Sequence, residues 1–188
     1  WRKYDAVAPG GTCLTVSFVN ITGGAMCCGI EVIATPTTQS RAITPPADTR
    51  ISKKINCGGW ADTGDWLPDE GYSDGTAPRY SEAAIANAGD VPQSVYQTSR
   101  EGETVVYAID LPSGLYNLRL HFAELVHEES AARLFDIDVN GTTHSEDFDI
   151  FDQSDAKNTA AVVDIAEIEV TDTLTITLTC LEKQAHNH

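Results

Sequence analysis

The sequence has little positive charge. Among 188 residues only 12 are lysine or arginine, against 28 that are aspartate or glutamate, which gives a formal net charge of −16. A surface of this sign repels phosphate backbones and anionic lipid headgroups. We therefore expect no nucleic acid among the partners of this protein.

Long apolar runs are absent as well. No stretch approaches the roughly 20 apolar residues that a membrane-spanning helix needs, so we expect no membrane insertion. No apolar leader precedes Trp1, which we interpret as the start of a mature chain or of an excerpt from a longer protein. Apolar residues still make up 41% of the sequence, which is enough for a domain with a real core.

The five cysteines lack the spacing of a zinc site, since no C-x-x-C pair and no paired histidines occur. Two glycosylation sequons, at Asn20 and Asn140, agree with a secretory route. We therefore expect an extracellular glycoprotein, secreted or at the cell surface, with at least one disulfide. Because the number of cysteines is odd, at least one thiol stays free or pairs outside the chain.

Catalytic signatures are missing too. The sequence has no G-x-S-x-G motif, and the HEES stretch at 127–130 lacks the second histidine of a helical zinc site. Abundant carboxylates alone do not make the paired geometry of a glycoside hydrolase. We predict that the protein is not an enzyme.

Strand patterns dominate what is present. Alternating or β-branched stretches occupy residues 104–111, 115–125, 133–139, 147–151, 160–170 and 173–180. Short turn sequences (PSG, NG, TD) separate them, which is typical of an all-β protein built as an antiparallel β-sandwich or jelly roll. The one helical candidate is residues 81–89.

The N-terminal part has a different organisation. Residues 35–50 contain three prolines and no periodicity, which predicts a linker. Before it, residues 13–18 alternate in the same way as residues 173–180, as if one strand occurred twice. This repetition indicates that the chain carries strands from more than one copy of the same unit.

Several motifs then occur in the order known from one family. They are KINCGGW (54–60), SVYQTSREGE (94–103), YAIDLPSGLYNLRLHFAEL (107–125), RLFDIDVNG (133–141) and DFDIFD (147–152). Together they resemble the malectin and malectin-like domains over roughly residues 51–180. The resemblance implies a β-sandwich that binds a short glucan end at loops on one edge, as a lectin without catalysis.

The resemblance also divides the chain. Residues 1–34 look like the closing strands of a malectin-like unit, either the tail of a preceding tandem repeat or a donor strand. Residues 35–50 are the linker, and residues 51–188 are a malectin-like domain lacking its last strand. The function expected first is carbohydrate binding. The alternative is a structural repeat of a secreted or cell-surface filament, assembled by strand complementation with neighbouring malectin-like units, with sugar binding lost.

Aromatic residues gather in a loop-rich segment, where Trp60, Trp66, Tyr72 and Tyr80 are separated by glycine and proline. Aromatic faces stack on the apolar faces of pyranoses, and loops on a rigid sandwich usually carry the binding site. Matched to the family's ligand positions, the resemblance keeps an aromatic residue only near Tyr80 and substitutes Glu101 and His127 elsewhere. The ligand-binding residues we predict for a glycan are Trp66, Tyr72, Tyr80, Glu101 and His127.

Two further expectations follow from the resemblance. It places Cys28 on the closing strand and Cys57 in the NCGG strand, so a Cys28–Cys57 bridge is feasible, with Cys180 pairing Cys13 or Cys27. It also makes residues 133–141 a strand that enters a hairpin. Residues 136–147 match most of a calcium loop, but the flanking helices of that motif are missing, so we expect no metal site and keep Ca²⁺ only as an alternative.

Overall fold

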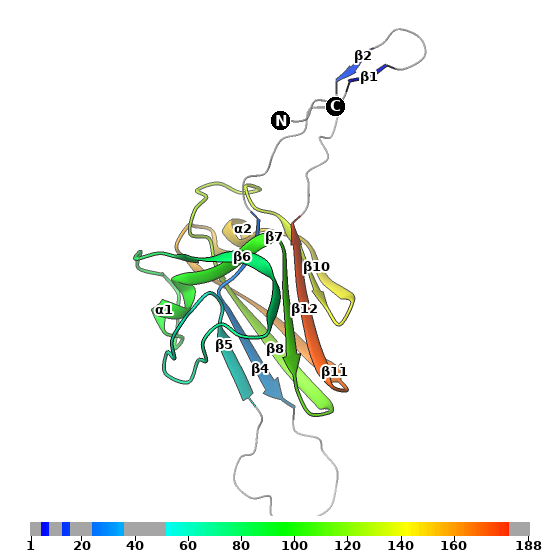
Figure 1. The fold of residues 1–188 in the computed structure, drawn as a ribbon. Coiled ribbons are helices and arrows are strands. Elements are labelled where there is room, and N and C mark those ends of the chain that lie inside the picture. The colour runs from blue at the N-terminus through cyan, green and yellow to red at the C-terminus, as the bar shows by residue number, and fades with distance from the viewer. Residues whose placement is uncertain (1–4, 8–12, 16–23, 36–51, 181–188) are drawn as a thin grey trace, which may run out of the picture.

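The structure is a computed structural model that describes residues 5–7, 13–15, 24–35 and 52–180 (Figure 1). The predictions for Asn20 and for most of the linker lie outside these residues. Strands β1 (Asp5–Val7) and β2 (Cys13–Thr15) pair with each other in a separate two-stranded sheet. All other strands belong to two larger sheets.

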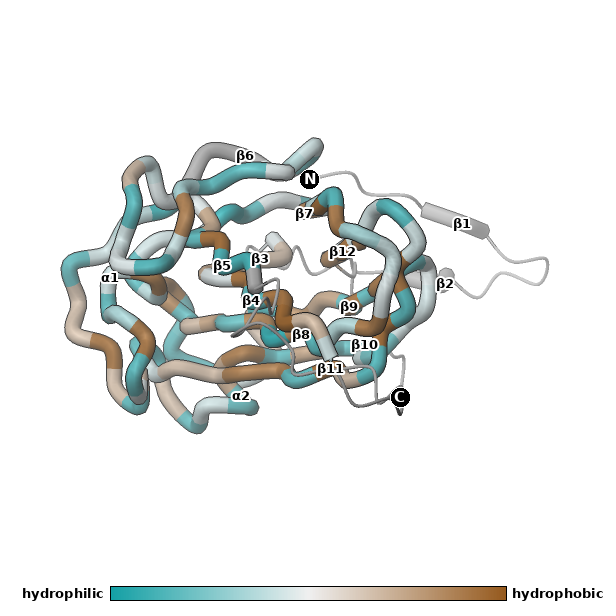
Figure 2. Tube along the Cα trace, turned by 90° about the horizontal axis from the view of Figure 1, so that it is seen from below, coloured by the Kyte–Doolittle hydropathy of each residue, from teal (hydrophilic) through white to brown (hydrophobic). Residues whose placement is uncertain are grey.

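Two antiparallel sheets face each other, as Figure 2 shows with β7 on one side and β8 and β11 on the other. The first sheet has the order β10 (Thr142–Phe148), β9 (Phe135–Val139), β12 (Thr173–Cys180), β7 (Thr98–Asp110), and β7 also pairs with β3 (Ala25–Cys27) and β6 (Tyr72–Tyr80). The second sheet has the order β11 (Ala160–Val170), β8 (Gly114–Ala123), β4 (Gly29–Ala34), β5 (Ser52–Asn56). The predicted all-β antiparallel sandwich is confirmed.

Alternation along the strands produces the core. On β8 the side chains of Tyr116, Leu118, Leu120 and Phe122 alternate with the others, are buried and face the other sheet. Phe122 packs against the rings of Phe135 and Phe148 at centroid distances of 5.9 and 5.1 Å. Burial of such large apolar side chains is the main stabilising contribution to the sandwich.

The N-terminal segment contributes to both sheets. Residues 25–27 pair with β7, the chain turns at Cys28, and residues 29–34 then lie between β8 and β5. Ile30 and Val32 of this segment are fully buried. We expected residues 13–34 to pair with a malectin-like sheet, of their own chain or of a neighbour. The structure pairs residues 25–34 in this way within the chain, whereas residues 13–15 pair with β1 in the separate two-stranded sheet.

A row of charges crosses the outer face of the second sheet. Cross-strand pairs place Glu31 beside Lys54 and beside Arg119, and Arg119 beside Asp164, so that the signs alternate over four strands. Arg119 donates to both oxygens of Asp164 at 2.7 and 3.2 Å. Exposed pairs contribute at most about 1 kcal/mol each, so this row helps to fix the register of β4 more than it stabilises the fold.

Residues 136–147, which match most of a calcium loop and were expected to form a hairpin, are a hairpin in the structure. β9 and β10 pair through Thr142 and Val139, and the connecting residues Asn140 and Gly141 have φ values of 49° and 76°. Two positive φ values in succession are the geometry of a two-residue hairpin turn. The Asn140 amide is also engaged, since it donates to the carbonyl of Glu169 at 3.2 Å and accepts from the amide of Thr175 at 2.9 Å.

The helix expected over residues 81–89 is not formed. Ala86 instead exchanges backbone hydrogen bonds with residues 158 and 160, and Asn87 has a φ of 57°. These contacts with a distant segment outweigh the modest helix preference of an alanine-rich stretch. The described helices are α1 (Gln93–Tyr96), which follows Pro92, and α2 (Ile150–Ser154). Neither of these described helices is long and apolar enough to cross a membrane.

Candidate functional site

Two exposed aromatic rings lie together beside the β6–β7 edge of the first sheet. Trp60 is 76% exposed and Tyr80, at the end of β6, is 56% exposed. Their ring centroids are 6.1 Å apart and their planes are inclined by 53°. We call Trp60 and Tyr80 the aromatic pair. Together they present two adjacent, inclined aromatic faces to solvent.

A buried ion pair holds the loop that carries Trp60. The Asp69 carboxylate accepts hydrogen bonds from Arg100 at 2.6 and 2.8 Å and from the Tyr107 hydroxyl at 2.7 Å. The Asp69 amide donates to the carbonyl of Gly59, the residue before Trp60, at 2.8 Å. Burial also raises the pKa of Tyr107 above its usual value, so its hydroxyl remains a donor. The loop is therefore fixed without help from a ligand.

Tyr72 belongs to the same surroundings. The guanidinium carbon of Arg100 lies 3.3 Å from the centroid of the Tyr72 ring, which is a cation–π contact. Tyr72 is 47% exposed, so one side of the ring covers the ion pair and the rest reaches solvent. Its position fits a covering role for the buried charge as well as the predicted contact with a ligand.

The other face of β6 and β7 is built from charges. Arg79 pairs with both oxygens of Glu101 at 2.6 and 3.2 Å, and Arg133 approaches Glu101 at 4.0 Å. Arg133 also donates to Glu124 at 2.7 Å. We call these four residues the ion-pair network. It alternates in sign from Arg79 at the surface to Glu124, which is 1% exposed.

Glu124 anchors the loop that contains His127. One of its oxygens accepts from the amides of Val126 and His127, at 2.8 and 3.0 Å. Burial by itself raises the pKa of Glu124, but the Arg133 hydrogen bond and charge outweigh burial and leave the pKa lowered. The half-buried His127 ring has a buried Nε2 without a hydrogen-bond partner among the described residues.

The structure separates two of the predicted site residues. Arg79 and Tyr80 are consecutive on a strand, so their side chains point to opposite faces. Glu101 shares a face with Arg79, whereas Tyr80 meets Trp60 on the other. The predicted Glu101 and His127 therefore belong with the ion-pair network, and Tyr80 belongs with the aromatic pair.

Trp66 lies in neither place. It is 1% exposed and packs edge-on against the ring of His121, with centroids 5.3 Å apart. The absence of a side chain at Gly29 makes room for it, since a Cβ there would approach the indole to 2.9 Å. The expectation that Trp66 stacks on a ligand does not fit this burial, because the ring is part of the packing.

His121 is the centre of a buried polar cluster on β8. Its Nδ1 lies 2.8 Å from the Tyr96 hydroxyl, and its Nε2 lies 3.6 Å from the Glu31 carboxylate. The neighbouring His121 ring is the main reason that the pKa of Glu31 is lowered. The cluster ties β4 to β8 and α1, which is a structural role.

The cysteine side chains are arranged differently from the expectation. The Cys57 sulfur lies 3.7 Å from the Cys27 sulfur. The Cys28 thiol points to the Tyr96 carbonyl at 3.8 Å, and burial raises its pKa. The side chains of Cys27 and Cys28 have different contacts because consecutive residues at the turn between β3 and β4 face in different directions.

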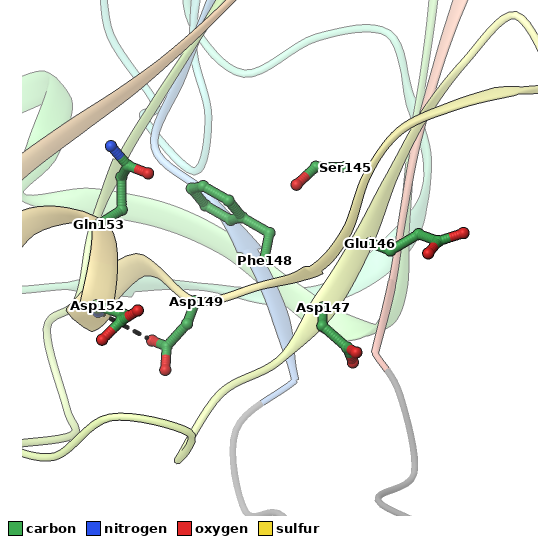
Figure 3. Close-up of a pocket in the computed structure, with 7 residues that line it drawn as sticks. All are labelled: Ser145, Glu146, Asp147, Phe148, Asp149, Asp152 and Gln153. Carbon is green, nitrogen blue, oxygen red and sulfur yellow. Dashed lines mark hydrogen bonds between the residues drawn. The ribbon is translucent and has the colours of Figure 1, made fainter.

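An acidic hollow of about 250 Å³ lies at the opposite edge of the first sheet (Figure 3). It is lined by Ser145, Glu146, Asp147, Phe148, Asp149, Asp152 and Gln153. Asp149 is already used as the cap of α2, where it accepts from the amides of Phe151 and Asp152. Phe148 is 8% exposed, so the hollow offers no open aromatic face for a sugar.

Comparison with known proteins agrees with this fold. The family model described as the malectin domain matches residues 51–187. The chain belongs to the malectin domain family. Malectin-A of Xenopus laevis is 42% identical over 72 residues, which are 37% of this chain and 26% of that protein. A probable LRR receptor-like serine/threonine-protein kinase of Arabidopsis thaliana is 33% identical over 100 residues, which are 49% of this chain and 9% of the kinase.

Solved structures show the same fold. The ANXUR2 extracellular domain from Arabidopsis thaliana matches 66% of this malectin-domain chain with a TM-score of 0.56 and 21% identity. The plant receptor-like kinase FER matches 77% of the chain with a TM-score of 0.55 and 22% identity. The chain covers 42% and 48% of these two structures, so it spans less than half of each.

Three residues that hold the Trp60 loop or belong to the ion-pair network carry no sequence signal of their own: Asp69, Arg79 and Arg133. Each is a charged residue in a chain with many charges, and its role depends on a partner 9 to 31 residues away. Period-two alternation along residues 72–80 could have separated Arg79 from Tyr80. Nothing in the sequence singles out Asp69 as the anchor of the Trp60 loop.

Proposed function

We propose that this malectin domain is a non-catalytic carbohydrate-binding module that works outside the cell and takes a neutral, glucan-type oligosaccharide. The observation that carries the proposal is the aromatic pair, two large exposed rings, of which Trp60 is on a loop that a buried ion pair fixes in place and Tyr80 is at the end of β6. A ring that is already held in position loses little conformational entropy when a sugar stacks on it. Membership of the malectin domain family adds support, since the resemblance to malectin domains implies sugar binding without catalysis.

Charge favours a neutral ligand. The chain has a net charge of −16, so an anionic glycan would be repelled over long range. Uronic acids and sulfated sugars are therefore disfavoured relative to uncharged hexoses. Uncharged pyranoses also have the apolar C–H face that aromatic rings contact best.

Calorimetric titration with gluco-oligosaccharides of increasing length tests this function. We expect Trp60→Ala and Tyr80→Ala each to weaken binding by about tenfold, equivalent to about 1.4 kcal/mol. Leu115→Ala is the matched control, because Leu115 is also an exposed apolar residue, 40% exposed, but lies on the second sheet. Absence of binding by the unmodified chain to every oligosaccharide in the series would overturn the proposal.

A second function, assembly by strand complementation, has one observation in its favour. The family match begins at residue 51, yet the second sheet needs β4, residues 29–34, between β8 and β5. A malectin unit made from residues 51–187 alone would leave this place open. A strand from a preceding repeat or from a neighbouring chain could fill the place, with residues 1–34 acting as that strand.

Light scattering on a size-exclusion column tests the assembly. The chain is compared with and without residues 1–34, over a range of concentrations. Polymers that grow with concentration and require residues 1–34 would support the assembly function. A compact monomer of about the 20.2 kDa chain mass would exclude it and leave carbohydrate binding as the function.

A further inference from the structure

Two buried thiols meet where the N-terminal segment joins the domain. Cys27 is the last residue of β3 in the first sheet, and Cys57 follows the end of β5 in the second. Their sulfurs are 3.7 Å apart, and the residues are 1% and 0% exposed. The Cys57 amide donates to the carbonyl of Cys28, the residue after Cys27, at 2.9 Å, so the end of β5 is held beside the turn between β3 and β4.

We propose that Cys27 and Cys57 form a disulfide when the chain folds under oxidising conditions, and that this bond locks residues 25–34 into their own domain. The bond would join two residues 30 positions apart and would bridge the two sheets. The closed loop contains the whole connection from β4 to β5. Once it is closed, the segment cannot leave to fill the sheet of another chain without breaking a covalent bond.

The chemistry balances with a disulfide oxidant such as oxidised glutathione. One thiolate attacks the oxidant and releases one glutathione thiolate, forming a mixed disulfide. The second cysteine then displaces the other glutathione and forms the Cys27–Cys57 bond. In total the two cysteines lose two protons and two electrons, and one oxidised glutathione becomes two reduced molecules.

The bond has to form during folding and not afterwards. Thiolates are the reacting species, and burial raises the pKa of the Cys57 thiol well above its usual value in the folded chain. Oxidant is also excluded from sulfurs that have essentially no exposed area. The unfolded or partly folded chain has neither obstacle, so oxidation is expected in the course of refolding.

The other described cysteines are less suited to Cys57. Cys28 is directed to the Tyr96 carbonyl and lies in a separate apolar cluster with Ile85 and Leu125. Cys180 ends β12 in the first sheet, where its cross-strand neighbour is Phe135 of β9. The structure thus selects Cys27 over its neighbour Cys28, whose bridge to Cys57 the family resemblance had made feasible.

Peptide mapping after oxidative refolding tests the assignment. The reduced, denatured chain is refolded in a mixture of reduced and oxidised glutathione, capped with an alkylating agent and digested with trypsin. Cleavage after lysine and arginine gives one peptide, residues 4–41, that contains Cys13, Cys27 and Cys28, and another, residues 55–79, that contains Cys57. We expect these two peptides to be joined, with a mass two hydrogens below their sum.

Serine variants then identify the cysteine, because trypsin does not separate Cys27 from Cys28. The double variant Cys13→Ser/Cys28→Ser leaves Cys27 as the one N-terminal cysteine and should retain the joined peptides. Cys27→Ser should abolish them, and Cys180→Ser should have no effect. The double variant keeps the test decisive even where Cys27→Ser fails to refold.

Two results would overturn the proposal. One is a refolded wild-type chain, with native circular dichroism, in which the two peptides remain separate. The other is a cross-link that persists in Cys27→Ser or is lost in the double variant, since either would assign the bond to Cys28 or Cys13. A supporting result predicts in addition that the oxidised chain has a higher unfolding midpoint than the same chain after reduction.

Discussion

The two faces of the β6–β7 edge are built on opposite principles. On one face the aromatic pair is exposed, and the charges that hold the Trp60 loop, Asp69 and Arg100, are satisfied by each other. On the other face the charges themselves form the surface and continue inward as the ion-pair network. The first arrangement leaves binding surface open, whereas the second uses most of its hydrogen-bonding capacity internally. Consecutive residues on one strand, Arg79 and Tyr80, therefore serve different purposes.

The largest effect is expected at the buried end of the ion-pair network. Arg133→Ala removes the partner of Glu124, and the two side chains are 2% and 1% exposed. Leaving a buried carboxylate without its counter-charge should reduce the free energy of unfolding by about 3–5 kcal/mol, measured by urea denaturation. Arg119→Ala is the control, since its exposed pair with Asp164 should contribute at most about 1 kcal/mol. Equal effects of the two variants would contradict the inferred importance of burial.

A smaller loss of stability is expected at Asp69, whose ion pair holds the Trp60 loop. Asp69→Asn keeps the shape of the side chain but removes the charge that Arg100 and Tyr107 bind, so we expect a loss of about 2–3 kcal/mol. The Trp60 loop should also become more mobile, which time-resolved tryptophan anisotropy can detect. Asp65→Asn tests a solvent-exposed carboxylate paired with Lys54 and should change neither quantity appreciably.

These sites also show what the sequence could and could not predict. Alternation on β7, β8, β9, β11 and β12 gave the sandwich, and Asn140-Gly141 gave the hairpin, because both signals are local. The helix over 81–89 was wrong, because backbone contacts of Ala86 with residues 158–160 are not local. Burial of Trp66 and the choice between Cys27 and Cys28 depend on which way a side chain points at a bend. Composition and spacing do not contain that information.

The next largest effect is expected on acidification, which should weaken the ion-pair network. Burial raises the pKa of Glu124 in the folded chain, but Arg133 and two backbone amides outweigh burial and leave the pKa below the 4.5 of an unfolded chain. Its contribution to stability is therefore fully present above that unfolded value and is lost as pH falls through the lower folded value. Urea midpoints measured from pH 7 downward should therefore decrease once the pH is below the unfolded pKa of Glu124. The fall should be shallower in Glu124→Gln, and an unchanged slope would assign it to other carboxylates.

The smallest effect separates the two faces most sharply. Arg79→Ala breaks a half-exposed pair with Glu101, so the free energy of unfolding should fall by about 1 kcal/mol or less. Glucan affinity should stay within about twofold of the unmodified chain, whereas Tyr80→Ala, one residue along the same strand, should weaken it about tenfold. A reversed pattern would move the ligand to the face of Glu101 and His127. Because the two residues differ in position by one step of a strand, this comparison depends on side-chain direction alone.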